Sequence, residues 1–470
     1  MLKEELIRNI IQNCPFTPTK GQKEIINTAT DFILSPQALS ICLLRGYAGT
    51  GKTALLSALV RTLTTLKRRT ILMAPTGRAA KVLSSQAQHP ATTIHHRIYR
   101  QKEYSPLTHN FVRDKNLFKN TLFIVDEASM LSVAGGGFCT ESILSDLIEY
   151  VYSGTGCRLI LSGDPAQLPP IGEDTCPALS PGIYESFGLT VMEAELNEVV
   201  RQQSSSGILK NATELRQTIT AHQFFRPPAI RFNGFPDIRP LPGQQLVETL
   251  KDTYSLHPND TMIITRSNKR ANIYNKGIRT QIFDFEDELT CGDRLIIAKN
   301  DYFWGSGDDD LDFLANGDAA EVQQARNFRT AYGFHFADVV MQLPDYNHRE
   351  LEATVLLDTL HSDSPALGKE QTDRLFHAVE NDYAEISNRR ERMKHLKQNP
   401  YLNALQVKYA YALTCHKAQG GQWQHVFIDQ GYIPDTTHDP SYFRWLYTAI
   451  TRATQMLYLI NWPKSQTLTD

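Results

Sequence analysis

Short apolar runs divide the first 200 residues of the chain, and each run ends at a polar loop. The main runs are residues 41–44, 70–74, 122–125 and 158–162. Between them apolar residues return at helical spacing, as in the segment that starts at Ala54. Strands that are apolar throughout are typical of a parallel sheet buried on both faces. The pattern therefore predicts an α/β unit whose ligands gather at the carboxyl ends of its strands.

A second series of runs predicts another α/β unit later in the chain. Its members are residues 261–265, 294–298, 407–413, 426–428 and 457–460. Between about residues 300 and 400 the hydrophobic pattern changes, because apolar and polar residues alternate in 334–343 and 351–357. Asn316-Gly317-Asp318 is in addition a tight-turn signal. This interruption is expected to form a small antiparallel barrel.

The interruption ends in a helical, charged segment that runs from about residue 365 to residue 397. Its last part is a basic cluster of Arg389, Arg390, Arg392, Lys394 and Lys397. The cluster could follow a phosphate backbone, or it could be the solvated face of a helix. The sequence alone favours the solvated face.

Composition narrows the class of protein. A chain of 470 residues should hold two or three domains, since one core rarely grows past roughly 250–300 residues. The net charge of −3 does not indicate a polyanionic partner, so any nucleic-acid surface must come from local placement of Lys and Arg. The seven cysteines are scattered without a C-x-x-C pair, which favours a reducing compartment over zinc or disulfides. With no apolar run near the ~20 residues that span a bilayer and no signal-like N-terminus, we expect a cytoplasmic protein.

A complete phosphate-binding loop follows the first apolar run. Residues 46–53 read Gly-Tyr-Ala-Gly-Thr-Gly-Lys-Thr and match the pattern G-x-x-x-x-G-K-[ST] between a predicted strand and a predicted helix. Glycines let backbone N–H groups surround phosphate oxygens, and the helix N-terminus adds partial positive charge. Lys52 is expected to reach the terminal phosphates, and Thr53 to ligate Mg²⁺. The predicted residues for a nucleoside triphosphate are Gly46, Ala48, Gly49, Thr50, Gly51, Lys52 and Thr53.

Polar side chains also follow the last two runs of this first series, residues 122–125 and 158–162. Asp126 and Glu127 come directly after residues 122–125, and side chains alternate along a strand, so the two carboxylates can take different roles. Asp126 is expected to hold Mg²⁺ through water, and Glu127 to orient or deprotonate an attacking water. The run at 158–162 leads to Gln167, whose amide offers a donor and an acceptor for sensing a γ-phosphate.

These segments, taken in order, resemble the motifs of superfamily 1 helicases, and the set is most similar to the RecD/Dda-like branch, superfamily 1B. The matching segments are residues 46–53, 74–80, 93–95, 126–130, 163–169, 199–202, 411–420 and 446–453. They span nearly the whole chain. The resemblance implies an α/β fold of two RecA-like parallel-sheet domains, with a β-hairpin insertion and an SH3-like β-barrel insertion. The expected boundaries are 1–204 for the first domain with a hairpin at 97–119, 205–300 and 401–470 for the second, and 301–400 for the barrel and its helical extension.

The resemblance also implies roles at the nucleotide. Gln22 matches the family's adenine-reading glutamine, although an ordinary surface glutamine would be the simpler interpretation, and Gly420 is assigned to ATP binding. Arg201 and Arg452 match arginines that reach the γ-phosphate. Guanidinium groups stabilise the charge that spreads over a departing phosphoryl group, and an arginine finger contributes ~10³–10⁵ in rate. The implied catalytic set is Lys52, Glu127, Gln167, Arg201 and Arg452.

Nucleic-acid contacts are implied on both domains. The residues are Pro75, Thr76 and His95 in the first domain and Thr414 and His416 in the second. The two histidines could instead be satisfied structural residues. In this family the hairpin acts as a pin that splits base pairs, and Tyr104 and Phe111 are the candidate aromatic residues, unless both pack on their own domain. One departure is Ala418, where many relatives have serine.

We therefore expect an ATP- and Mg²⁺-dependent DNA helicase that moves 5′ to 3′ along single strands, acts as a monomer, and binds single-strand/duplex junctions. Its setting would be DNA repair, recombination or replication, with other proteins of those processes as potential partners. Two alternatives stay open. The chain could be an ATP-gated DNA-binding subunit of a larger RecD-like complex, or its substrate could be RNA, because backbone contacts do not exclude a 2′-OH.

Overall fold

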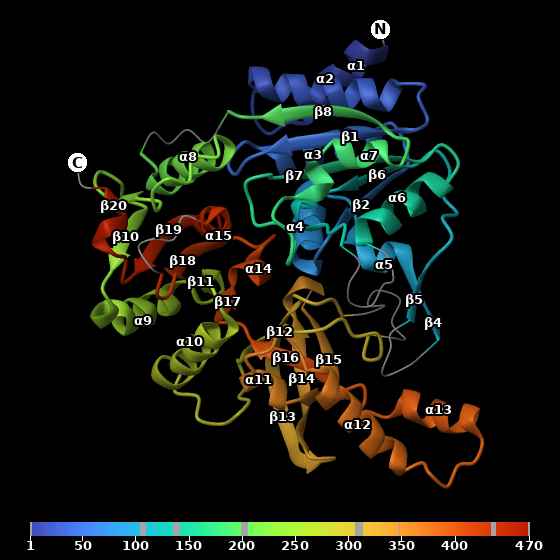
Figure 1. The fold of residues 1–470 in the computed structure, drawn as a ribbon, viewed down its shortest axis with the longest axis vertical. Helices are drawn as coiled ribbons and strands as arrows, with labels where there is room; N and C mark the ends of the chain where they lie inside the picture. Colours follow the sequence, from blue (N-terminus) through green and yellow to red (C-terminus); the bar gives the residue numbers. More distant parts are fainter. Residues whose placement is uncertain are drawn as a thin grey trace.

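Two parallel sheets, a closed barrel and a β-hairpin make up the computed structural model (Figure 1). It describes residues 2–103, 110–134, 142–198, 205–305, 314–346, 348–433 and 439–468. Within these ranges no helix is both long and apolar enough to cross a membrane.

The first sheet is parallel throughout, with strand order β3-β2-β6-β7-β1-β8. Its strands are β1 (Ser40–Gly46), β2 (Thr70–Ala74), β3 (Ala91–Thr93), β6 (Leu122–Val125), β7 (Arg158–Gly163) and β8 (Thr190–Leu196). The four predicted runs form its centre, and the edge strands β3 and β8 were not predicted. Edge strand β8 is only partly buried and places Glu193 and Glu195 among its apolar residues, so no continuous apolar run marks it.

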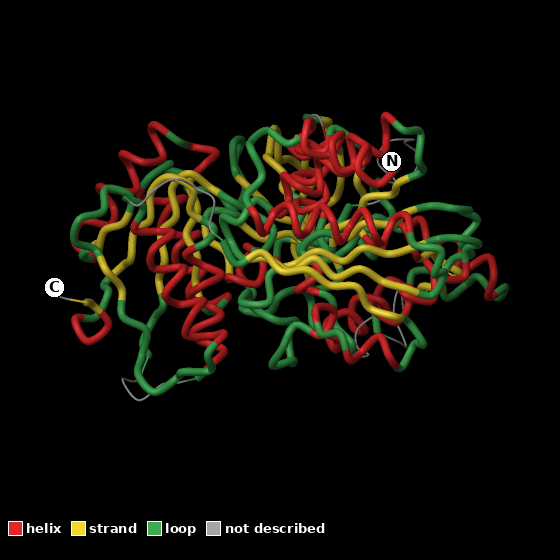
Figure 2. The backbone as a smooth tube through the Cα atoms, turned by 90° about the horizontal axis from the view of Figure 1, so that it is seen from above, coloured by secondary structure: helices red, strands yellow, loops and turns green. Residues whose placement is uncertain are grey.

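Helices cover both faces of this sheet, as the layers in Figure 2 show. They are α1 (Leu2–Asn13), α2 (Lys20–Leu34), α3 (Lys52–Thr65), α4 (Gly77–Ala87), α5 (Ile94–Ile98), α6 (Ile143–Ser153) and α7 (Gly182–Glu185), with the 3₁₀ turns Ala128–Met130 and Pro177–Leu179. Alternate residues of β1 enter different cores: Cys42 and Leu44 pack with α1–α4, whereas Ile41 and Leu43 pack with α5 and α6. Burial on both faces explains why these strands are apolar without alternation.

The second sheet is also parallel, with order β10-β19-β18-β11-β17. Its strands are β10 (Ile238–Leu241), β11 (Thr261–Thr265), β17 (Ala412–Thr414), β18 (Trp423–Asp429) and β19 (Ala453–Ile460). Its helices are α8 (Gly207–Thr220), α9 (Leu246–Leu256), α10 (Asn268–Gln281), α14 (Cys415–Ala418) and α15 (Pro440–Ile450). Short strands β9 (Ile230–Arg231) and β20 (Thr467–Leu468) pair beside it, and the 3₁₀ turns are Gly243–Gln245, Pro258–Asp260 and Lys464–Gln466.

The barrel corrects part of the sequence interpretation. It consists of β12 (Arg294–Ile297), β13 (Ala319–Ala331), β14 (Phe334–Leu343), β15 (Arg349–Leu356) and β16 (Leu405–Tyr409). The runs 294–298 and 407–413 had been predicted in the second parallel sheet. In the structure β12 is a barrel strand, and the run 407–413 divides between β16 in the barrel and β17 in the sheet. An apolar run indicates a buried strand but not its partner, so the barrel extends beyond 301–400 on both sides.

The barrel closes through a parallel pairing of β15 with β16, whereas its other pairings are antiparallel. Parallel neighbours need a long crossover. The crossover is the charged helical segment, which contains α11 (Asp358–His361), α12 (Lys369–Asn381) and α13 (Arg389–Gln398) and projects from the body of the protein (Figure 1). A 3₁₀ turn, Pro344–Tyr346, follows β14.

A hairpin of β4 (Tyr99–Glu103) and β5 (Asn110–Arg113) leaves the first domain after α5, within the predicted range 97–119. Its connection, including Tyr104, lies outside the described residues. The side chain of Phe111 is likewise not described, so the choice of a pin aromatic stays a prediction.

A buried ion pair joins the second domain to the barrel. Arg279 of α10 donates to both oxygens of Asp293, at 2.7 and 2.8 Å, and the two side chains are 6% and 0% exposed. Asp293 precedes β12 and also accepts a hydrogen bond from the hydroxyl of Tyr411 at 3.0 Å. The guanidinium lies over the ring of Tyr409, 4.5 Å from its centroid. The pair therefore fixes α10 against both barrel strands that adjoin the sheet.

Replacing Arg279 by alanine is expected to lower the free energy of unfolding by about 3–5 kcal/mol, because the Asp293 carboxylate would stay buried without its cation. Urea denaturation followed by circular dichroism measures the loss. Arg326 pairs with Glu352 on the exposed side of the barrel and is the matched control. Arg326→Ala should cost less than about 1 kcal/mol. Equal losses for the two substitutions would contradict the role given to the buried pair.

Candidate functional site

The phosphate loop has the geometry that its sequence predicts. β1 ends at Gly46 and α3 begins at Lys52, and between them Gly49 and Gly51 have φ of 77° and 84°. This left-handed conformation is open to glycine at little cost. No side chain caps α3, so its first N–H groups remain available to an anion. Lys52 Nζ donates to Gly46 O at 2.7 Å, which holds the ammonium over the loop.

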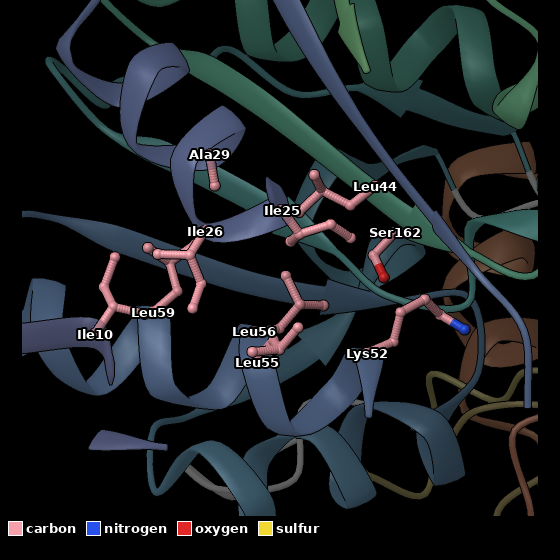
Figure 3. A pocket seen from close by; sticks show the side chains of 10 residues that line it. All are labelled: Ile10, Ile25, Ile26, Ala29, Leu44, Lys52, Leu55, Leu56, Leu59 and Ser162. Carbon is pink, nitrogen blue, oxygen red and sulfur yellow. The ribbon is translucent and has the colours of Figure 1, made fainter. Parts of the chain in front are cut away.

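Aliphatic side chains support the loop from behind. They surround a cavity of about 20 Å³, about the room that one water requires, which is too small for a ligand. Ile10, Ile25, Leu44 and Leu55 are among its lining, and Lys52 and Ser162 bring the only charged and hydroxyl groups (Figure 3). In this view the Lys52 ammonium points away from the aliphatic side chains. The start of α3 is therefore packed on an apolar base.

The first carboxylate after β6 lies beside the loop. Thr53 Oγ1 donates to Asp126 Oδ2 at 3.1 Å, and Ser162 Oγ donates to Asp126 Oδ1 at 2.9 Å. Asp126 is 5% exposed. A hydroxyl and a carboxylate at this distance are the protein ligands that Mg²⁺ takes together with phosphate oxygens. Among the described residues no cluster of three or more His, Cys, Asp or Glu could hold a metal ion.

Glu127 is the most perturbed carboxyl of the site. Its backbone is left-handed, with φ of 54°, which is uncommon for a residue with a side chain. Burial raises the pKa of Glu127, and the neighbouring negative charge of Asp126 raises it further. The positive charges of Arg452 and Lys52 act in the opposite direction. Its Oε2 atom is buried and has no hydrogen-bond partner in the described structure, as expected of a group that acts on a substrate or water.

Arg452 comes from the second domain and is only 3% exposed. Its guanidinium donates to Thr448 O at 3.0 Å, to Gly421 O at 3.2 Å and to Thr451 Oγ1 at 3.1 Å. The side chains of Tyr447 and Thr448, just before Arg452 in the chain, accept hydrogen bonds from Ala48 N and Leu168 N, so this segment lies against the first domain. The position of Arg452 toward a γ-phosphate stays a prediction. Arg201 lies in the range 199–204, outside the described residues, and its position likewise stays a prediction.

Tyr447 is a site residue that the sequence analysis did not single out. Its hydroxyl accepts a hydrogen bond from Ala48 N at 2.9 Å and donates to Asp164 Oδ2 at 2.8 Å. It lies in the same segment as Arg452, on the last turns of α15, and is 1% exposed. A buried tyrosine needs a hydrogen-bond partner, but the sequence does not say that the partner is the phosphate loop of the other domain.

Three predicted nucleotide residues have additional or different contacts. Gln22 is fully buried, where its Oε1 accepts from Thr19 N and its Nε2 donates to Thr50 O, so it braces the phosphate loop. Gln167 is 3% exposed, and its Oε1 has no partner within the described structure. A β-carbon on Gly420 would meet Ala79 and Thr76, not the phosphate loop. The roles of these residues toward ATP stay predictions.

A groove of about 590 Å³ lies between the first domain and the barrel with its extension. The first domain contributes Pro75, Thr76, Thr93 and His95. The opposite wall consists of Ala298, Lys299, Asn300, Ala315, Asn316, Pro365, Ala366, Leu367, Lys369, Thr372 and Asp373. The three residues predicted to contact nucleic acid in the first domain are therefore neighbours. Burial lowers the pKa of His95, so the imidazole is neutral near pH 7 and suits hydrogen bonding more than ion pairing.

The predicted residues of the second domain lie elsewhere. Thr414 ends β17 and His416 is on α14, and neither lines the groove. Burial lowers the pKa of His416 as well. Gly420, just after α14, lies against the first turn of α4, because a β-carbon there would come within 2.9 Å of Ala79 Cβ.

This geometry defines a class. A phosphate loop after β1, a carboxylate pair after β6 with β7 between the two strands, and an arginine from a second parallel-sheet domain make a P-loop nucleoside triphosphatase whose cleft is shared by two domains.

Comparison with known proteins places the chain within that class. The AAA domain family matches residues 18–225, and the UvrD-like helicase C-terminal domain matches residues 409–460. The ATP-dependent DNA helicase dda of Enterobacteria phage T4 is 26% identical over 299 residues, which are 60% of this chain and 61% of that protein. The ATP-dependent RecD2 DNA helicase of Deinococcus radiodurans is 27% identical over 197 residues, which are 42% of this chain and 24% of that protein.

A solved structure gives the same fold. It describes DNA unwinding at forked double-stranded DNA by two coordinating Pif1 helicases, and it superposes with a TM-score of 0.50 at 16% identity, over 97% of this chain and 95% of that one. The expected arrangement of RecA-like sheets, barrel and hairpin is confirmed. The chain is therefore similar, in its family matches and in these relatives, to helicases of the RecD/Dda type, superfamily 1B. The matches span about three fifths of Dda and about a quarter of RecD2.

Lys52→Ala is expected to abolish ATP hydrolysis, because the terminal phosphates would lose their main cation. Glu127→Gln should lower kcat by about 100-fold or more and preserve ATP binding, since an amide cannot accept a proton. Phosphate release and the binding of a fluorescent nucleotide measure the two effects. Lys67→Ala, at the exposed far end of α3, is the control and should retain activity. Undiminished turnover by the Lys52 variant would refute the site.

The pH dependence of kcat should report on Glu127. As a base it must be ionised, so activity should fall as pH drops through its raised pKa, at a higher pH than an ordinary glutamate of about 4.3. The charge of Asp164 also raises this pKa. Asp164→Asn should therefore move the acid limb to lower pH, measured as the pH–rate profile at saturating ATP. An acid limb that does not move would remove Glu127 as the titrating group.

Proposed function

We propose that this chain is an ATP-dependent DNA helicase that moves along single-stranded DNA and unwinds duplex ahead of it. The carrying observation is the shared cleft, in which Tyr447 of the second domain is hydrogen-bonded to Ala48 of the phosphate loop and to Asp164, beside the Thr53–Asp126 pair. The relatives named as DNA helicases and the groove beside α4 support the choice of substrate.

Hydrolysis follows from the groups around the cleft. Thr53 and Asp126 would hold Mg²⁺, which neutralises charge on the phosphate oxygens. Glu127 takes a proton from the attacking water, and its raised pKa makes it a better base at neutral pH than an ordinary glutamate. Arg452, with Arg201, stabilises the charge that develops on the γ-phosphoryl oxygens. Gln167 contributes an amide whose buried oxygen is free to meet the water or the phosphate.

Movement follows from the division of the cleft. A nucleotide that contacts both domains favours their closed arrangement, and loss of the γ-phosphate removes that preference. In this proposal Thr76 and His95 bind the strand on one domain, and Thr414 and His416 bind it on the other. The affinity of each domain for the strand then alternates as the cleft opens and closes. Hydroxyl and neutral imidazole groups contact phosphates without reading sequence.

The groove gives the strand a path past the barrel. Lys299 and Lys369 add positive charge to a wall that faces Thr76 and His95. The β4–β5 hairpin follows directly after α5, the helix that contains His95. In this proposal the hairpin is the pin that meets the junction of single strand and duplex. By the subfamily resemblance the direction is 5′ to 3′.

A 5′-tailed DNA duplex should be unwound in the presence of ATP and Mg²⁺, whereas a 3′-tailed duplex should not. Strand separation is measured with a fluorophore and quencher on the two strands, at enzyme concentrations low enough to favour single chains. Glu127→Gln is the control and should bind the same substrate without unwinding it.

The same assay separates the alternatives. Unwinding of the 3′-tailed duplex would reverse the polarity, and equal unwinding of a tailed RNA duplex would widen the substrate. Strand binding with ATP hydrolysis but no unwinding would favour a subunit of a larger complex.

A further inference from the structure

Leu168 is held by the second domain on both sides of its backbone. Its N–H donates to Thr448 Oγ1 at 2.8 Å, and its carbonyl accepts from Gln419 Nε2 at 2.9 Å. All three residues are less than 5% exposed. Breaking such buried bonds leaves polar groups without water or protein partners, which costs about 1–3 kcal/mol each. While these two bonds are intact, the loop around Leu168 moves with α15 and the end of α14.

The same loop borders the nucleotide cleft. The loop starts at Asp164, whose negative charge raises the pKa of Glu127. Gln167, the candidate for sensing the γ-phosphate, directly precedes Leu168, and its backbone carbonyl accepts from Arg444 of α15 at 3.4 Å. A displacement of the Leu168 peptide necessarily changes the position of Gln167, because the two are covalent neighbours.

Gln419 is also linked to the groove. The next residue, Gly420, has φ of 75°, and a β-carbon there would lie 2.9 Å from Ala79 Cβ and 3.5 Å from Thr76 Oγ1. Thr76 lines the groove and caps α4, since its hydroxyl accepts from Ala79 N at 3.2 Å. Gln419 thus contacts the loop beside the nucleotide cleft. Gly420 lies against α4, the helix beside the groove.

We propose that Gln419 is the positioning residue that couples strand binding in the groove to hydrolysis in the cleft, an inference that rests on the proposed function. A strand bound at Thr76 fixes α4 and the Gly420 backbone packed on it. Gln419 transmits that position to the Leu168 carbonyl and hence to Gln167. Coupling of this kind is reciprocal for binding, so ATP should also change the affinity for the strand. Gln419 itself touches neither ligand.

The test compares strand-stimulated and strand-free ATP hydrolysis. Gln419→Ala should lower the stimulation by single-stranded DNA about tenfold, within the 5–150-fold range typical of coupling between sites. Strand-free hydrolysis and the affinity for a fluorescent oligonucleotide should stay within about twofold. Gln419→Glu should lose the same stimulation at equal side-chain volume, because its carboxylate oxygens would face the Leu168 carbonyl.

Gln424→Ala is the matched control. Gln424 is on β18 and its amide donates to Asp260, also of the second domain, at 3.3 Å, so its removal should leave the stimulation unchanged. Thr448→Val completes a double-mutant cycle. Since Thr448 and Gln419 hold the same residue, the double variant should lose much less than the product of the two single losses.

Thermal melting by circular dichroism selects variants that fold like the wild type. Full stimulation in both Gln419 variants would overturn the inference. So would a loss of stimulation explained by an equal loss of strand affinity, because Gln419 would then belong to the groove. A wild-type chain whose hydrolysis ignores DNA would instead overturn the proposed function.

Discussion

The buried contact between α15 and the phosphate loop is the interaction on which the rest of the structure depends. The Tyr447 hydroxyl bridges Ala48 N and Asp164 Oδ2, so groups from two strand ends of the first domain and one helix of the second share one hydrogen-bonded unit. It stabilises only the closed arrangement, because an opened cleft would leave these polar groups to water. The same closure brings Arg452, which follows α15, close enough for its charge to act on Glu127.

The closed arrangement matters for catalysis because of the charged groups that surround the cleft. Two adjacent carboxylates lie at the end of β6, Asp126 buried and Glu127 partly buried, and like charges so close are unfavourable without cations. Lys52 supplies one cation from the same domain and Arg452 supplies another from the other domain. A triphosphate in this cleft would have positively charged groups on both sides. Its negative charge would therefore favour the closed arrangement of the domains over the open one.

Helix α4 is where the first domain meets both other units. Gly420 of the second domain packs on its first turn. From the barrel, Asp318 lies so close to Gly77 that a side chain there would clash, and Lys81 donates to Pro344 O at 3.1 Å. A carboxylate at a helix N-terminus is favoured by the helix dipole. The groove wall formed by Thr76 is therefore positioned by contacts from two directions, and movement of either unit changes the groove.

The amino-acid sequence by itself determined the elements and the chemistry of single segments. The central strands of both sheets were predictable because burial on both faces requires continuous apolar runs, and the phosphate loop because its function needs glycines and a lysine at set spacing. Only the tertiary structure decided which strands are partners, since β12 reads like a sheet strand yet belongs to the barrel, and the run 407–413 is divided between barrel and sheet. It alone brought Tyr447 to Ala48 and Gln419 to Leu168, because contacts between residues hundreds of positions apart depend on domain packing that no local pattern records.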